Sequence, residues 1–114
     1  MTELQQGIIF DRHESSMEEA YLGEWINGYG DRFLIKRRLL GWYFAKYDFS
    51  SAGKPERGST TVFLSREQIK ISGYTFERTA DSRLRLVIPP MQGDQSVLFS
   101  AIRLDDSGRC FERV

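Results

Sequence analysis

Turn-forming residues recur along this chain at intervals of roughly 8–12 residues, and the segments between them alternate apolar with polar side chains. The alternation is clearest at residues 83–88, Arg-Leu-Arg-Leu-Val-Ile, which a Pro-Pro pair follows. A period of two is typical of a β-strand with one buried face. The pattern predicts strands at Gly23–Asn27, Arg32–Arg38, Trp42–Ser50, Thr60–Leu64, Gln68–Ser72, Tyr74–Thr79, Arg83–Ile88, Ser96–Leu104 and Arg109–Val114.

The predicted fold class is all-β. No long amphipathic helical segment competes with the strands, so neighbouring strands should be antiparallel and joined as hairpins, the last one turning at Asp105–Gly108. Ser51–Gly58 is rich in turn formers and is the clearest predicted loop. Because closure removes exposed strand edges, we predict a single antiparallel up-and-down β-barrel of about eight short strands over residues 21–114.

Residues 1–20 are predicted to form an N-terminal arm with a short helix. Ser15–Glu19 contains two overlapping Ser-x-x-Glu capping boxes. Between Met1 and Glu24 there are six acidic residues and one basic residue, so the rest of the chain carries the matching basic excess. The apolar stretch Gly7–Phe10 should be buried, since each large apolar side chain gains about 1.5–3 kcal/mol on burial. The arm can pack on its own barrel or exchange with a second copy, and of these two we favour exchange, which makes a homodimer.

Composition limits the partners. With 114 residues the chain has room for one domain, and 16 Lys+Arg against 16 Asp+Glu give a net charge of zero. This balance predicts no nucleic-acid partner and no membrane partner. No apolar run approaches the roughly 20 residues of a membrane helix, and no secretory signal begins the chain. We expect a cytoplasmic protein.

The segment Gly23–Ile35, Gly-Glu-Trp-Ile-Asn-Gly-Tyr-Gly-Asp-Arg-Phe-Leu-Ile, resembles the opening hairpin of the avidin and streptavidin family, Gly-x-Trp-x-Asn-x-x-Gly-Ser. Gly-x-Trp on a first strand is shared more widely by calycins, including lipocalins. The resemblance implies a barrel with Trp25 closing one end, and ligand-binding positions for Asn27 and Asp31 with Tyr43 near them. Asp31 stands where that family has serine, and its later pocket tryptophans have no counterpart here, so biotin binding is not implied.

No motif in the sequence indicates catalysis. His13 is the only histidine and Cys110 the only cysteine, and neither belongs to a recognisable nucleophile or metal-ligand motif. Asp105 and Asp106 precede Ser-Gly and suit a turn better than acid–base chemistry. We therefore expect a non-enzymatic protein with no catalytic residues, no metal site and no cofactor.

The strand pattern predicts two kinds of surface. Arg83 and Arg85 share one face of a strand, and we interpret such basic faces as the solvated outside of the barrel. Aromatic residues at alternating positions predict a mostly filled interior: Trp25, Phe33, Tyr43, Tyr47, Phe49, Phe63, Phe76 and Phe99.

Two functions follow as hypotheses. In the first, the protein binds a small apolar or aromatic ligand at the barrel mouth, through Trp25, Asn27, Tyr29, Asp31 and Tyr43. In the second, it is a protein-binding module of inhibitor, immunity or adaptor type, with a filled core and a functional outer surface. The acidic arm and the loop Ser51–Gly58 favour the second hypothesis.

Overall fold

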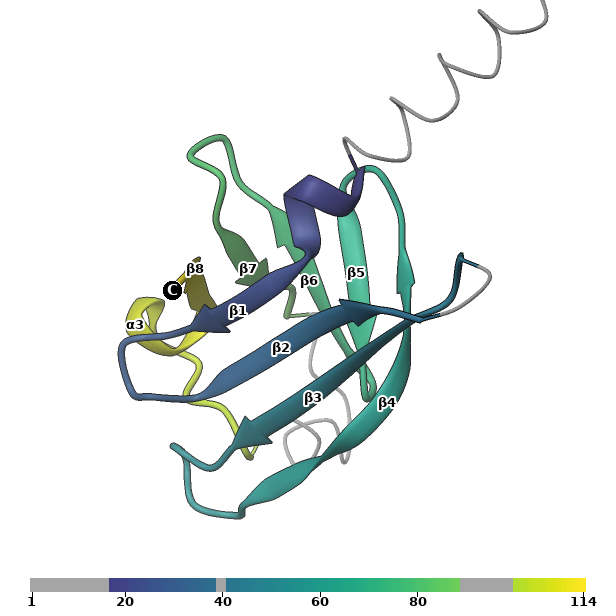
Figure 1. Cartoon of the computed structure of the whole chain (residues 1–114). Helices are drawn as coiled ribbons and strands as arrows, with labels where there is room; N and C mark the ends of the chain where they lie inside the picture. Colours follow the sequence, from purple (N-terminus) through teal and green to yellow (C-terminus); the bar gives the residue numbers. More distant parts are fainter. Residues whose placement is uncertain (1–16, 39–40, 89–99) are drawn as a thin grey trace, which may run out of the picture.

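The computed structural model describes residues 17–38, 41–88 and 100–114. Within these ranges the chain forms a closed barrel of eight antiparallel strands, each paired with its sequence neighbours (Figure 1). The predicted fold class is therefore confirmed. The elements are β1 (Gly23–Ile26), β2 (Arg32–Arg37), β3 (Tyr43–Phe49), β4 (Glu56–Leu64), β5 (Gln68–Ile71), β6 (Tyr74–Arg78), β7 (Leu84–Leu86), α3 (Asp106–Arg109) and β8 (Cys110–Arg113).

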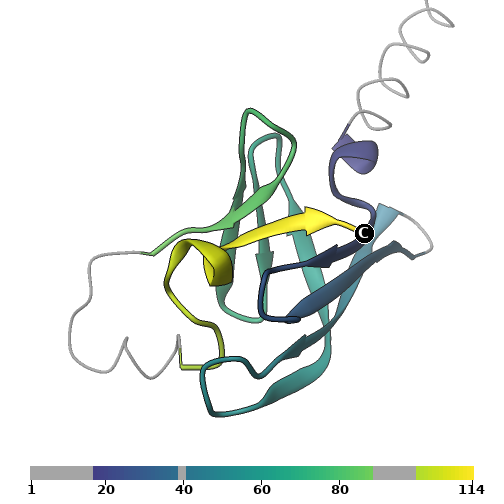
Figure 2. The same cartoon turned by 90° about the vertical axis from the view of Figure 1, so that its left-hand side faces the viewer.

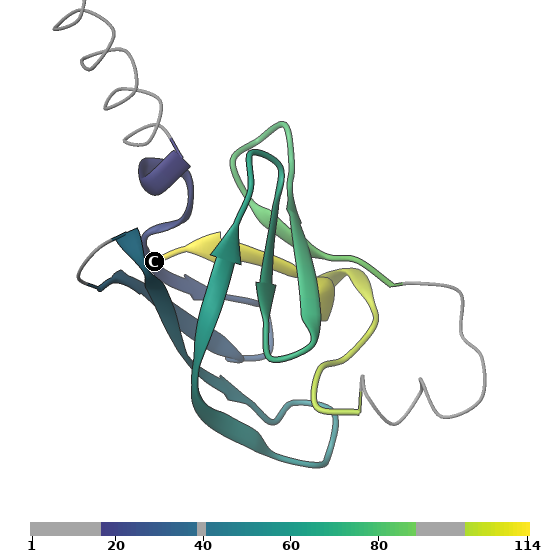
Figure 3. The ribbon, with the colours of Figure 1, turned by 90° about the vertical axis from the view of Figure 1, so that its right-hand side faces the viewer.

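The barrel closes between its last strand and its first. In β8, Arg113 lies opposite Trp25 of β1, while Phe111 lies opposite Leu84 of β7. The long strand β4 joins the two halves, because it pairs with β3 over residues 56–62 and with β5 over residues 63–64 (Figure 3).

The predicted C-terminal hairpin is wrong. Residues 100–104 form no strand, and β8 pairs with β7 and β1 instead; residues 96–99 lie outside the described part of the chain. The expected turn at Asp105–Gly108 is the start of α3, capped by Asp105, whose side chain accepts a hydrogen bond from the Gly108 amide. A Cβ at Gly108 would lie 2.0 Å from the Arg103 carbonyl oxygen, so only glycine allows this tight helical packing.

The predicted loop at residues 51–58 is shorter than expected, because β4 already begins at Glu56. Glu56 lies opposite Phe49, and Gly58 lies opposite Tyr47. A Cβ at Gly58 would lie 2.9 Å from the Tyr47 hydroxyl oxygen. The glycine that suggests a turn in the sequence therefore makes room for an aromatic ring inside a strand.

Phenylalanine rings fill the barrel interior. Phe33, Phe76 and Phe111 are fully buried, with ring centroids 5.0–5.3 Å apart, and Phe49 lies 6.2 Å from Phe33 and from Phe111. This packing agrees with the prediction of a mostly filled core. One predicted interior residue is misplaced: Phe63 is 68% exposed on the outside of β4. Phe99 lies outside the described residues.

A helical turn at residues 17–21 leads into β1, in agreement with the predicted short helix. The Leu22 amide donates to the Glu18 carbonyl, and Tyr21 is fully buried against the barrel. The C-terminal strand ends beside this turn (Figure 2). Ser15 and Ser16 of the capping boxes, the Gly7–Phe10 stretch and His13 lie outside the described residues. In the described chain, no helix has the length and apolar character that a membrane span requires.

Candidate functional site

The five residues predicted to bind a ligand are distributed over both ends of the barrel. Asn27, Tyr29 and Asp31 lie in the β1–β2 turn at one end. Tyr43 begins β3 opposite Arg37 of β2, which places it at the other end. Trp25 is 1% exposed, and its indole N–H donates to the Tyr21 carbonyl. The structure thus brings three of the five residues together and leaves Trp25 and Tyr43 apart from them.

The Asn27 side chain is buried and fully hydrogen-bonded within the chain. Its Nδ2 donates to Asp31 Oδ2 and to the Gly108 carbonyl oxygen, each at 2.9 Å. Its Oδ1 accepts from the Tyr29 and Asp31 amides at 3.0 and 2.9 Å. An amide side chain offers two donors and two acceptor positions, and these four bonds within the chain use all of them.

The Asp31 carboxylate is used in the same way. Its Oδ1 accepts from the Ser50 and Ser51 amides at 2.9 and 3.0 Å, and its Oδ2 accepts from the Ser51 hydroxyl and from Asn27. Asp31 is 2% exposed. These bonds tie the β1–β2 turn to the β3–β4 turn, so Asn27 and Asp31 close this end of the barrel.

Tyr29 is the exposed member of the predicted site. Its hydroxyl donates to Asp105 Oδ2 at 2.6 Å, and the Arg103 guanidinium lies 4.8 Å from its ring centroid. The hydrogen bond between Tyr29 and Asp105 raises the pKa of Tyr29 above its ordinary value and lowers the pKa of Asp105. Tyr29 therefore joins the turn to the N-cap of α3.

A second polar cluster lies at this end of the barrel and was not predicted from the sequence. The Glu56 carboxylate accepts from the Ser72 and Tyr74 hydroxyls, each at 3.0 Å, and Ser72 Oγ lies 3.2 Å from the Tyr47 hydroxyl oxygen. Burial, with the nearby Glu56 carboxylate, raises the pKa of Tyr74 well above its ordinary value. The sequence pattern predicts a loop at Glu56. Only the register of β4, which puts Glu56 opposite the buried Phe49, shows that its side chain points inward.

The outer surface of β2, β3 and β4 has a different character. Cross-strand pairing places outward residues in rows. Arg38 continues this pattern beyond β2, because its backbone N–H donates a hydrogen bond to the Trp42 carbonyl oxygen. We call this surface the basic–aromatic face, and it consists of Arg32, Leu34, Lys36, Arg38, Trp42, Phe44, Lys46, Asp48, Arg57, Ser59, Thr61 and Phe63. Five cations and one carboxylate give it a net charge of +4, although the whole chain has a net charge of zero.

One end of the basic–aromatic face carries exposed rings. Trp42 is 58% exposed and Phe63 is 68% exposed, the two largest values among the aromatic side chains of the described residues. The Arg38 guanidinium lies 5.0 Å from the Phe44 ring centroid on the same face. The prediction that Phe63 lies inside the barrel is wrong. Alternation separates the two faces of a strand but does not say which of them is buried.

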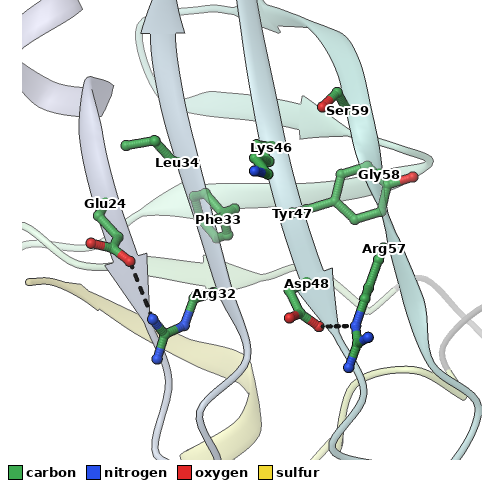
Figure 4. Close-up of a pocket in the computed structure, with 10 residues that line it drawn as sticks. All are labelled: Glu24, Arg32, Phe33, Leu34, Lys46, Tyr47, Asp48, Arg57, Gly58 and Ser59. Carbon is green, nitrogen blue, oxygen red and sulfur yellow. Dashed lines mark hydrogen bonds and ion pairs between the residues drawn. The ribbon is translucent and has the colours of Figure 1, made fainter.

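The other end of the basic–aromatic face contains a groove of about 380 Å³ (Figure 4). Two ion pairs border it: Arg32 lies 3.5 Å from Glu24, and Arg57 lies 2.9 Å from Asp48. Lys46 stands between these pairs beside Leu34, and it makes no ion pair with any described residue. The groove could thus receive an acidic group against a partly apolar wall.

No three His, Cys, Asp or Glu side chains in the described ranges lie close enough to hold a metal ion. Cys110 is a half-buried free thiol in β8. Comparison with known proteins gives no match to any family model, any curated protein or any solved structure.

Proposed function

We propose that this protein is a non-enzymatic protein-binding module whose binding surface is the basic–aromatic face. One observation carries the proposal: a chain of zero net charge concentrates a charge of +4 and its two most exposed aromatic rings on one side of three neighbouring strands. Exposed apolar patches bordered by polar residues are typical of interaction sites. Tryptophan and arginine are also the residue types that contribute most to binding at protein interfaces.

The chemistry of the face indicates the chemistry of the partner. Arg38 and Lys36 flank the rings of Trp42 and Phe44, and Lys46 is available beside the groove. A partner that presents carboxylates next to apolar side chains would complement both. Electrostatic complementarity of this kind speeds association and weakens with salt.

The competing hypothesis of a small ligand at the barrel mouth gains less support. A ligand on Asn27 and Asp31 would have to replace hydrogen bonds that these side chains already make to the chain. In the barrel interior, packed phenylalanine rings occupy the space that such a ligand would need. A relationship to calycins rests on Gly23-x-Trp25 and on the closed antiparallel barrel, and we propose it for the fold without its ligand.

Affinity capture with matched variants tests the proposal. The full chain and the double variant Trp42→Ser/Phe63→Ser are used as bait in extract from the native source. Tyr29→Ser is the control, because Tyr29 is an exposed aromatic residue at the barrel mouth. We expect one stoichiometric protein to bind the full chain and Tyr29→Ser and to be lost with the double variant. Loss with Tyr29→Ser and retention by the double variant would overturn the proposal.

A further inference from the structure

We infer that the acidic N-terminal arm of a second copy of this chain, residues 1–16, occupies the basic–aromatic face. The inference rests on the proposed function and names its partner. The protein would then be a homodimer in which each copy's arm covers the other copy's face.

The arm has the composition that the face requires. Residues 1–16 contain three acidic residues and one basic residue, a net charge of −2, opposite in sign to the face. They also contain the apolar run Ile8-Ile9-Phe10, which Asp11 directly follows. Carboxylates beside large apolar side chains are the complement of Lys36, Arg38 and Trp42.

The described chain shows where the arm starts. Glu18, in the helical turn at residues 17–21, lies 3.1 Å from the Arg37 guanidinium and accepts from the Tyr43 hydroxyl at 2.7 Å. Arg37 and Tyr43 adjoin Arg38 and Trp42 in sequence, so the arm begins at the aromatic end of the face. An extended chain spans about 3.3–3.6 Å per residue, which lets Phe10 reach about 25 Å from Met17.

Glu18 holds the start of the arm over the end of its own barrel. It contacts Arg37 and Tyr43, whose register points inward, whereas Arg38 and Trp42 point outward. We assign the arm to the face of a second copy because mutual exchange of two arms covers both faces and both apolar runs in a closed two-fold dimer.

Sedimentation equilibrium of the full chain tests the inference. We compare the full chain with an arm variant (Ile8→Ser/Ile9→Ser/Phe10→Ser), a face variant (Trp42→Ser/Phe63→Ser), their combination, and the control Tyr29→Ser. We expect a dimer for the full chain and for Tyr29→Ser. The arm variant and the face variant should each raise the dissociation constant by about a hundredfold.

The combined variant makes the test specific. If the arm and the face contact each other, the combined variant should dissociate little more than either parent, because both sets of changes remove the same contact. Additive effects would overturn the inference, as would a monomeric full chain or an arm variant whose dissociation constant equals that of the full chain. A monomeric full chain whose captured partner is lost with the face variant would overturn this inference and leave the proposed function standing.

Discussion

The guanidinium group of Arg113, on the last strand, lies 4.6 Å from the ring centroid of Trp25, on the first strand. It donates to the carbonyl oxygens of Glu19, Ala20 and Leu22, at the end of the N-terminal helical turn. Carbonyl groups at a helix end lack partners within the helix, and a basic side chain can satisfy them. One residue thus closes the barrel and fixes the point where the arm begins.

Replacement of Arg113 should destabilise both the closure of the barrel and the N-terminal helical turn. We predict that Arg113→Ala lowers the free energy of unfolding by about 1.5–3 kcal/mol, the range for hydrogen bonds to charged groups. Arg83→Ala is the control, because its exposed pair with Asp81, at 3.2 Å, should contribute less than about 1 kcal/mol. Urea unfolding of the two variants measures the difference. Equal losses would show that Arg113 does not cap the turn.

The hydrogen bonds of Asn27 predict a larger effect. Asn27→Ala leaves the amides of Tyr29 and Asp31 and the carbonyl of Gly108 without their partner. We expect a loss of about 2–4 kcal/mol in urea unfolding, since each buried unsatisfied group costs about 1–3 kcal/mol. Ser59→Ala, on the exposed outer face, should change stability by less than about 0.5 kcal/mol. A loss near that of Ser59→Ala would remove the basis for calling Asn27 structural.

Two buried tyrosines should respond oppositely to removal of their hydroxyl groups. The Tyr21 hydroxyl has no hydrogen-bond partner among the described residues, whereas the Tyr74 hydroxyl donates to Glu56. Tyr21→Phe should therefore leave stability unchanged or raise it by up to about 1 kcal/mol, and Tyr74→Phe should lower it by about 1–3 kcal/mol. Thermal unfolding at neutral pH compares them. A greater loss for Tyr21→Phe would contradict the assignment.

Tyr21 also predicts how stability changes in alkali. Burial raises its pKa from the ordinary 10.0 to about 12. Between these values the unfolded chain releases a proton that the folded chain keeps, so the free energy of unfolding falls as the pH rises from about 10 towards 12. At pH 11, one pKa unit above the ordinary value, the loss is about 1.4 kcal/mol. Urea unfolding from about pH 8 to pH 11 should show a smaller fall for Tyr21→Phe than for the unaltered chain.

Much of the barrel could be predicted from sequence because its strands obey local rules. The alternation in Arg32–Arg38 and the two glycines around Tyr29 define the first hairpin without reference to any distant residue. The C-terminal pairing could not be found that way. Asp105 caps a helix, and Phe111 pairs with Leu84 across 27 positions of sequence. Long-range pairing depends on closure of the whole barrel.

The candidate site was harder to predict for a related reason. Alternation shows that Phe63 shares a face of its strand with Thr61, but only the pairing of β4 with β3 shows that this face is outside. The polarity of Asn27 and Asp31 suggested a ligand, whereas the structure gives them partners from Ser51 and Gly108, far away in sequence. Whether a polar residue is free to bind depends on such distant partners.

The two tryptophans provide the most direct test of where this protein binds. Trp25 is buried with its indole N–H on the Tyr21 carbonyl, and Trp42 is exposed on the basic–aromatic face. Their indole N–H signals can be followed by NMR in the ¹⁵N-labelled arm variant, whose face no arm covers, while the captured partner or the unlabelled full chain is added. We predict that the Trp42 signal shifts or broadens and that the Trp25 signal and the Asn27, Tyr29 and Asp31 amides stay in place. Perturbation of Asn27, Tyr29 and Asp31 with an unchanged Trp42 signal would contradict binding at the outer face.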